Sequence, residues 1–171
     1  MSKTIIKWIE DKVNGLTFAD IGGIGLRSIN ERISTAIINN AESATMIDLR
    51  KKDFKMWNIF HETMKQKAIT GYKTIENVDV TAPDLHSIIG EYDFVHCAGI
   101  MYHLPSPLLA MQNLYKITKK YLVVNTVTIP EYINNAEGEM SFKGSQALFM
   151  PGINSEERLK KKKWFILYLV N

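Results

Sequence analysis

The sequence predicts an α/β fold in which a mainly parallel sheet carries helices on both faces. Apolar runs of strand length alternate with stretches of helical periodicity through residues 1–129. Three glycines, Gly22, Gly23 and Gly25, follow the first run, and Asp48 ends the second. Strands and helices that alternate in this way form parallel sheets, whose ligands bind at the carboxyl ends of the strands. We therefore expect three layers and a ligand site where the glycines meet the acid.

The elements before Pro83 follow from the periodicity of the apolar residues. Residues 4–13 have apolar side chains at helical spacing with charged side chains opposite them. The strand, helix and strand that come next are expected to form a right-handed crossover. In order, we expect a helix at 4–13, a strand at 16–21, a helix at 29–39, a strand at 44–48, a helix at 54–67 and a strand at 72–80.

The elements after Pro83 continue the alternation. Asp84 is expected to cap a short helix at 84–89. A strand at 92–98, a helix at 108–118 and a strand at 121–127 follow. Residues 131–152 are less regular and suggest a hairpin lid, Ser155 looks like a helix start, and residues 164–170 form an apolar run of strand length.

We expect one domain over residues 1–171, with a core at 1–129 and a lid with a C-terminal helix and strand at 130–171. The 171 residues have ordinary hydrophobic (46%) and charged (23%) contents, which suit a single compact core. Charged residues among the apolar ones of the N-terminal helix fit neither a signal peptide nor a membrane span. We expect no contact with a membrane.

Charge and cysteine content limit the other classes of function. The net charge of +3 is modest, and much of it comes from the lysine run at 160–163. Such a run can touch nucleic acid or anionic lipid, but a solvated helix end is the commoner explanation, so charge does not support a nucleic-acid partner. Cys97 is the only cysteine, which excludes a disulfide framework and favours a reducing, cytoplasmic setting. No metal site is expected.

The first glycine turn distinguishes two kinds of nucleotide site. A dinucleotide site places a pyrophosphate on the helix N-terminus, and the carboxylate of Asp20, just ahead of Gly22, would repel it. The same carboxylate is favourable next to the cationic amino-acid end of S-adenosylmethionine. The electrostatics therefore favour the methyl donor, and an NAD site is the more distant alternative.

Two segments of the chain resemble the class I S-adenosylmethionine-dependent methyltransferases. The first is Phe18-Ala-Asp-Ile-Gly-Gly-Ile-Gly25, and the second is Tyr92-Asp-Phe-Val-His-Cys-Ala-Gly-Ile-Met-Tyr-His-Leu-Pro-Ser-Pro107. The likeness spans residues 16–129 and implies a Rossmann-like fold. A weaker likeness, in the second segment, is to the transferases that modify the wobble uridine of transfer RNA with a carboxymethyl group.

The chain departs from the family pattern in its glycine spacing. The family has acid-x-Gly-x-Gly-x-Gly, whereas Ile24 and Leu26 stand here where the second and third glycines would fall. Gly23 and Gly25 can substitute for them, because a shifted turn still leaves room for the methionine end. The affinity for the cofactor is left open by this change.

The resemblance implies which residues surround the cofactor. Asp48 would accept hydrogen bonds from the ribose, Asp79 would accept from the adenine amino group, and small residues at the end of the fourth strand would let the methionine portion pass. Each residue also has a structural interpretation: Asp20, for example, could cap the following turn through its backbone amides. The expected cofactor-binding residues are Asp20, Gly22, Gly23, Gly25, Asp48, Leu49, Asp79, Val80, Cys97, Ala98 and Gly99.

Tyr102 and His103 are the candidates for chemistry, because they follow the strand whose end should lie nearest the donated methyl group. A neutral His103 could take a proton from a hydroxyl or amine acceptor. Alternatively, His103 orders its loop by hydrogen bonding and Tyr102 only packs on the ligand. His96 is expected to be structural. Methyl transfer needs no dedicated base, since positioning the nucleophile in line with the methyl group achieves much of the reaction.

The expected activity is methyl transfer to an acceptor, small or otherwise, that the sequence does not identify. A non-catalytic or truncated binding subunit with the same fold is one alternative, because the glycine spacing is altered and only one of the two usual C-terminal antiparallel strands is recognisable. Carboxymethyl transfer to transfer RNA is another. The C-terminal edge is therefore expected to be short, through truncation or fragmentation, and its exposed strand could pair with a second subunit as a homo-oligomer.

Overall fold

The computed structural model describes residues 3–126, 132–135 and 138–141. Contacts between residues divide the chain into two units. The first comprises Met1–Ala98 and Ser106–Val124, and the second comprises Gly99–Pro105 and Asn125–Asn171. Each unit is described by itself below. The single domain expected over residues 1–171 stays a prediction.

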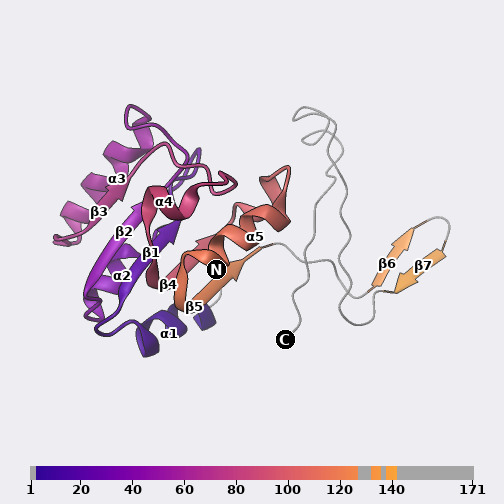
Figure 1. The fold of residues 1–171 in the computed structure, drawn as a ribbon, viewed down its shortest axis with the longest axis horizontal. Helices are drawn as coiled ribbons and strands as arrows, with labels where there is room; N and C mark the ends of the chain where they lie inside the picture. The colour runs from indigo at the N-terminus through magenta and orange to yellow at the C-terminus, as the bar shows by residue number, and fades with distance from the viewer. Residues whose placement is uncertain (1–2, 127–131, 136–137, 142–171) are drawn as a thin grey trace. The chain divides into compact units, whose positions relative to one another are not determined.

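A five-stranded, all-parallel sheet forms the centre of the first unit, with the strand order β3-β2-β1-β4-β5 (Figure 1). β1 pairs in parallel with β2 on one side and with β4 on the other. The order therefore reverses between β1 and β4, and ligands of such open sheets bind outside the carboxyl ends of the strands at this point. The strands are β1 (Thr17–Ile21), β2 (Ser43–Ile47), β3 (Lys73–Ile75), β4 (Tyr92–Ala98) and β5 (Thr118–Asn125).

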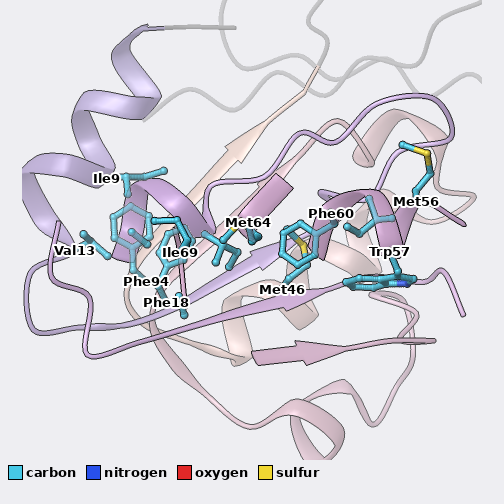
Figure 2. Close-up of a cluster of buried hydrophobic side chains, with 14 residues drawn as sticks. Ile9, Val13, Phe18, Met46, Met56, Trp57, Phe60, Met64, Ile69 and Phe94 are labelled. Atoms are coloured by element: carbon cyan, nitrogen blue, oxygen red, sulfur yellow. The ribbon is translucent and has the colours of Figure 1, made fainter. Parts of the chain in front are cut away.

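One face of the sheet packs against the first three helices through a buried apolar cluster. Phe18 of β1, Met46 of β2 and Phe94 of β4 lie in this cluster (Figure 2). Successive strand residues point to opposite faces, so Asp20, Asp48 and His96 share the side of the sheet on which the cluster lies. The helices are α1 (Lys3–Lys12), α2 (Ile33–Ile38) and α3 (Lys55–Gln66), and their buried members include Ile9, Ile33, Ala36, Trp57, Phe60 and Met64.

Two more helices, α4 (Leu85–Ile89) and α5 (Pro107–Lys116), connect β3 to β4 and β4 to β5. From β1 to β3 the chain moves toward one edge of the sheet, and after β3 it moves toward the other edge through β4 to β5. Because the crossovers are right-handed, α4 and α5 lie on the face opposite to the first three helices. Both helices bury apolar side chains, among them Leu85 and Leu114. Helices on both faces of a parallel sheet confirm the predicted three-layer α/β fold.

Four predicted details are wrong. The strand expected at 121–127 begins earlier, at Thr118, and ends at Asn125. The helix expected at 29–39 begins only at Ile33, because Ile29 forms a β-bridge with Ile24 and the chain between them turns back on itself. The strand expected at 72–80 is limited to Lys73–Ile75, since Asn77 has a φ of 59°, which a strand cannot accommodate. Asp84 occupies the N-cap position of α4 but makes no side-chain capping bond.

The second unit contains a 3₁₀ helix, η1 (Met101–His103), and an antiparallel hairpin of β6 (Tyr132–Asn135) and β7 (Gly138–Ser141). The hairpin lies within the segment 131–152 for which one is predicted, while its action as a lid stays a prediction. The expected helix start at Ser155, the strand at 164–170 and the short C-terminal edge all lie outside the described residues. Among those described, no helix combines the length and apolar character needed to cross a membrane.

Candidate functional site

The glycine loop begins at the carboxyl end of β1 and folds back on itself. Gly22 has a φ of 84°, a conformation that L-residues with a side chain rarely adopt, and its N–H donates to the carbonyl of Ile47 at the end of β2 (3.0 Å). The N–H of Asn30 donates to the carbonyl of Gly23 (2.9 Å). Together with the Ile24–Ile29 bridge, these bonds make residues 22–32 a small closed loop rather than a direct turn into α2.

Gly23 and Gly25 are needed for close packing within this loop. A Cβ at Gly25 would lie 2.6 Å from the backbone oxygen of Ser28, which is closer than real Cβ contacts. A Cβ at Gly23 would lie 2.7 Å from the end of the Met46 side chain. The atoms that approach both glycines therefore belong to the protein itself.

Asp48 follows β2 directly and holds the loop from the other side. Its Oδ2 accepts the N–H of Ile24 (3.0 Å), and its Oδ1 accepts the N–H of Arg50 (2.8 Å). The residue is 5% exposed. An ionised carboxylate has about four lone-pair positions, so these bonds leave roughly half of its acceptor capacity for other donors. Ribose hydroxyls are donors of the right kind, and the site therefore fits the ribose of a nucleoside.

The environment of Asp48 disfavours its charge. Burial raises the pKa of Asp48 above its ordinary value, although the hydrogen bonds from Arg50 and Ile24 oppose the rise. The nearby carboxylate of Asp20 adds to the rise. A buried carboxylate with unused lone pairs gains when a hydroxyl donates to it, because the donor replaces lost hydration.

Asp20 lies deeper than Asp48 and makes two contacts. Its Oδ1 lies 2.8 Å from Nδ1 of His96, which is its register partner on β4, and its Oδ2 accepts the N–H of Arg32 at the start of α2. Asp20 and His96 are both essentially buried. The bond from Arg32 is a backbone amide contact, as in the capping role that was the alternative to cofactor binding for Asp20, whereas the contact with His96 is not. Its cofactor role stays a prediction.

The Asp20–His96 contact itself is not anticipated by the sequence reasoning. Two polar residues at register partners of neighbouring strands point to the same face, but their pairing requires the strand order to be known. Nε2 of His96 is buried and has no hydrogen-bond partner among the described residues. The expectation that His96 is structural stays a prediction.

The segment after β3 lies beside Asp48. The N–H of Val78 donates to the backbone oxygen of Asp48 (3.0 Å), which brings the neighbouring Asp79 to the same edge of the sheet. Asp79 is exposed, and its Oδ1 accepts the N–H and the hydroxyl of Thr81. Asn113 of α5 donates from Nδ2 to the carbonyls of Val80 (2.9 Å) and Ala82 (2.8 Å). α5 therefore fixes the backbone on which Asp79 and Val80 stand.

Comparison with known proteins identifies the fold. No family model matches the chain, and no curated protein matches its sequence. Among solved structures, the N-terminal domain of EvdMO1, studied in the presence of SAH and D-fucose, aligns over 91% of this chain and 61% of its own length, with 15% identity and a TM-score of 0.54. A candidate sarcosine dimethylglycine methyltransferase from Galdieria sulphuraria aligns over 67% of this chain and 42% of its own, with 13% identity and a TM-score of 0.50.

The chain has the class I methyltransferase fold. A second EvdMO1 structure aligns over 67% of this chain, with 14% identity and a TM-score of 0.50. The aligned part covers only 26% of the EvdMO1 chain. At these identities the likeness concerns the fold, and function must be argued from the site.

Within this methyltransferase fold, most of the predicted cofactor residues gather at the carboxyl edge of the first unit. Cys97 is the register partner of Ile21, and Cys97 and Ala98 are buried at the end of β4, the strand next to β1. Burial, and to a lesser degree Asp20, raise the pKa of the Cys97 thiol. The thiol is therefore unreactive. Leu49, next to Asp48, is 55% exposed.

Three predicted residues belong to the second unit. Gly99 has a φ of 77°, and its N–H donates to the carbonyl of Asn125 (3.0 Å). The rings of Tyr102 and His103 lie 4.3 Å apart between centroids. Their cofactor and catalytic roles stay predictions. The residues described by the structure contain no group of three or more His, Cys, Asp or Glu side chains that could hold a metal ion.

Proposed function

We propose that this chain is an S-adenosylmethionine-dependent methyltransferase whose cofactor binds at the carboxyl edge of the sheet. The observation that supports the proposal most is the position of Asp48, which directly follows β2, the neighbour of β1, and which holds the glycine loop while keeping unused acceptor capacity at the carboxyl edge of the sheet. The presence of SAH in the EvdMO1 domain structure, a protein of the same fold, supports the same ligand class.

Each group at this edge has a separate task in the proposal. Asp48 accepts hydrogen bonds from the ribose hydroxyls, and Gly22 allows the backbone to turn close to the ligand. Asp79 accepts from the adenine amino group, with Val80 against the ring. When bound, the cofactor supplies an electrophilic methyl group on a sulfonium. Tyr102 and His103, which belong to the second unit, are the residues proposed for the chemistry, and a neutral His103 would take the proton of a hydroxyl or amine acceptor.

The ligand test is calorimetric titration with S-adenosylmethionine and S-adenosylhomocysteine, with NAD as the control for a dinucleotide site. We expect saturable binding of the first two and none of NAD. Asp48→Ala should abolish binding of both adenosyl ligands. Asp53→Ala removes an exposed acid from the same connection between β2 and α3, and it should leave their binding unchanged. Absence of binding by both adenosyl ligands would favour the non-catalytic alternative. Binding without turnover of any acceptor would favour it as well.

Because Asp48 also holds the loop, its variant alone does not separate ribose binding from loop collapse. A double-mutant cycle does so, with Asp48→Asn on the protein and the 2′-deoxyadenosyl analogue of S-adenosylhomocysteine as the altered ligand. We expect the analogue to bind the native protein about 10- to 150-fold more weakly, since a lost hydrogen bond to a charged group costs roughly 1.5–3 kcal/mol. The variant should not distinguish the two ligands. Equal losses in both proteins would remove Asp48 from the ribose site.

We also propose that the protein is located in the cytoplasm. Cys97 is its only cysteine, and this residue is buried as a free thiol. An oxidising compartment would offer no stabilisation to such a chain through disulfides.

A further inference from the structure

A cavity lies at the glycine loop, and Asp48 is not among the residues that line it. It is open, has a volume of about 590 Å³ and is formed by loop residues 26–29 and the first turns of α3. Ligand pockets commonly have volumes of roughly 300–1,000 Å³. None of the predicted cofactor or catalytic residues lines it.

Half of the residues that line this cavity are apolar, and the uncharged polar ones are Ser28 and Thr63. Leu26, Ile29, Met56 and Ile59 contribute to its lining. Ile29 and Met56 also belong to the edge of the apolar core cluster, and Met56 lies at the end of the cluster farthest from Ile9 and Val13 (Figure 2). Leu26 is 64% exposed and Ile59 is 47% exposed. The cavity therefore presents apolar surface to solvent, and a bound ligand could cover it.

The charged side chains of the lining have one sign. Arg27 stands at the tip of the loop and Lys55 at the first position of α3, and both line the cavity. No acidic side chain is among the described residues that line it. Neither cation makes an ion pair within the described part of the chain. A ligand with an apolar body and a single anionic group matches this combination of apolar wall and unpaired positive charge.

We propose that this cavity, formed by residues 26–29 and the start of α3, binds a small amphipathic anion. Its apolar body would cover Leu26 and Ile59, and its carboxylate, sulfonate or phosphate group would lie between Arg27 and Lys55. The inference is independent of the proposed methyl transfer, because it involves neither Asp48 nor the carboxyl ends of β1 and β4.

The test uses a matched pair of fluorescent probes on the full chain. 8-Anilinonaphthalene-1-sulfonate has an apolar body with one sulfonate, and N-phenyl-1-naphthylamine is nearly the same body without charge. We expect the double variant Arg27→Met, Lys55→Met to bind the sulfonate about three- to tenfold more weakly, the range expected for two partly exposed ion pairs. Its affinity for the neutral probe should stay within about twofold.

A control variant removes the same charge elsewhere. Lys51→Met, Lys52→Met changes two exposed lysines that do not line the cavity, and it should alter the binding of either probe by less than about twofold. Equal loss in both double variants would show a general charge effect and overturn the proposal. Unchanged sulfonate binding in all proteins would also overturn it.

A second pair of variants tests the proposal even if the double variant Arg27→Met, Lys55→Met does not fold. Ile59→Glu and Ile59→Gln have nearly the same shape at an exposed position of α3, and they differ by one negative charge inside the cavity. We expect the glutamate variant to bind the sulfonate at least about threefold more weakly than the glutamine variant, with equal binding of the neutral probe. Equal sulfonate affinities in this pair would contradict the site.

Discussion

Glu31 shows how a single buried acid stabilises the entry to α2. Its Oε2 accepts the N–H of Ser34 (2.8 Å), and its Oε1 accepts the Ser34 hydroxyl and the Lys67 ammonium, both at 2.7 Å. The side chain is 4% exposed. Burial alone would raise the pKa of Glu31, but the bonds from Lys67 and Ser34 outweigh it and hold the pKa below its usual value of 4.5. Glu31 therefore joins α2 to the end of α3 while it is charged.

Glu31→Gln is expected to destabilise the protein in a pH-dependent way. A depressed folded-state pKa contributes stability that is present above the unfolded-state value and is lost as pH falls through the folded-state pKa. At pH 7 we expect a loss of about 1–3 kcal/mol in the free energy of unfolding, and near pH 3 a smaller difference between variant and native protein. Urea unfolding at both pH values measures this. Glu62→Gln, at an exposed position of α3, is the control; a constant gap for Glu31→Gln would contradict the account.

For single residues, the sequence predicted which side chains belong to the candidate site but not which groups they contact. Asp20 and Asp48 stand out in the sequence because of their places: Asp20 stands just ahead of the glycines, and Asp48 ends the next apolar run. Their hydrogen bonds to Arg32 and Ile24 could not be predicted, since they depend on the path of the loop. The partner of Asp20, His96, depends on which strand lies next to β1, and no local pattern contains that information.

α5 affects the candidate site through one buried side chain. Asn113 is 2% exposed and is the donor for two carbonyls of the segment that carries Asp79 and Val80. We expect Asn113→Leu to lower the free energy of unfolding by about 1–3 kcal/mol, because both carbonyls lose their donor while one stays buried. It should also weaken S-adenosylhomocysteine binding through Val80.

The control for this prediction is Gln112→Leu, a neighbouring exposed position of α5, which should change stability by less than about 0.5 kcal/mol. Asn113→Asp is informative as well, since it keeps the shape but removes the amide donor. Chemical denaturation and calorimetry of each variant give both quantities. If Asn113→Leu bound the ligand as tightly as Gln112→Leu, α5 would have no part in positioning the site.

The bounds of helices and strands were predictable where most residues of the element are buried. They were not predictable where the backbone changes direction locally. β4 has the predicted bounds, Tyr92–Ala98, because a mainly apolar run of strand length, nearly all of it buried, is typical of a central parallel strand. α2 and β3 are shorter than predicted. In both cases the cause is a local backbone event, the bridge at Ile29 and the left-handed Asn77, which hydrophobic periodicity does not detect.

The cavity and the part of the proposed cofactor site around Asp48 depend on the packing of the first unit rather than on any single segment. Both use the glycine loop: Asp48 holds Ile24 on one side, and α3 meets Leu26 and Arg27 on the other. The cavity was not predictable from the sequence, because Arg27 and Lys55 come together only through the packing of the loop against α3. The fold was predictable, since it follows from the order of strands and helices along the chain.

Because the proposed cofactor site draws on several strands and loops, its occupation should stabilise the unit as a whole. A ligand at about a hundred times its dissociation constant contributes about 2.7 kcal/mol when it binds only the folded state. For a chain of this size that corresponds to a rise in Tm of roughly 5–10 °C. We expect this rise with S-adenosylhomocysteine, growing with its concentration, and none with NAD or in Asp48→Ala. Thermal melts followed by circular dichroism measure it, and an unchanged Tm at saturating ligand would contradict a cofactor site in this unit.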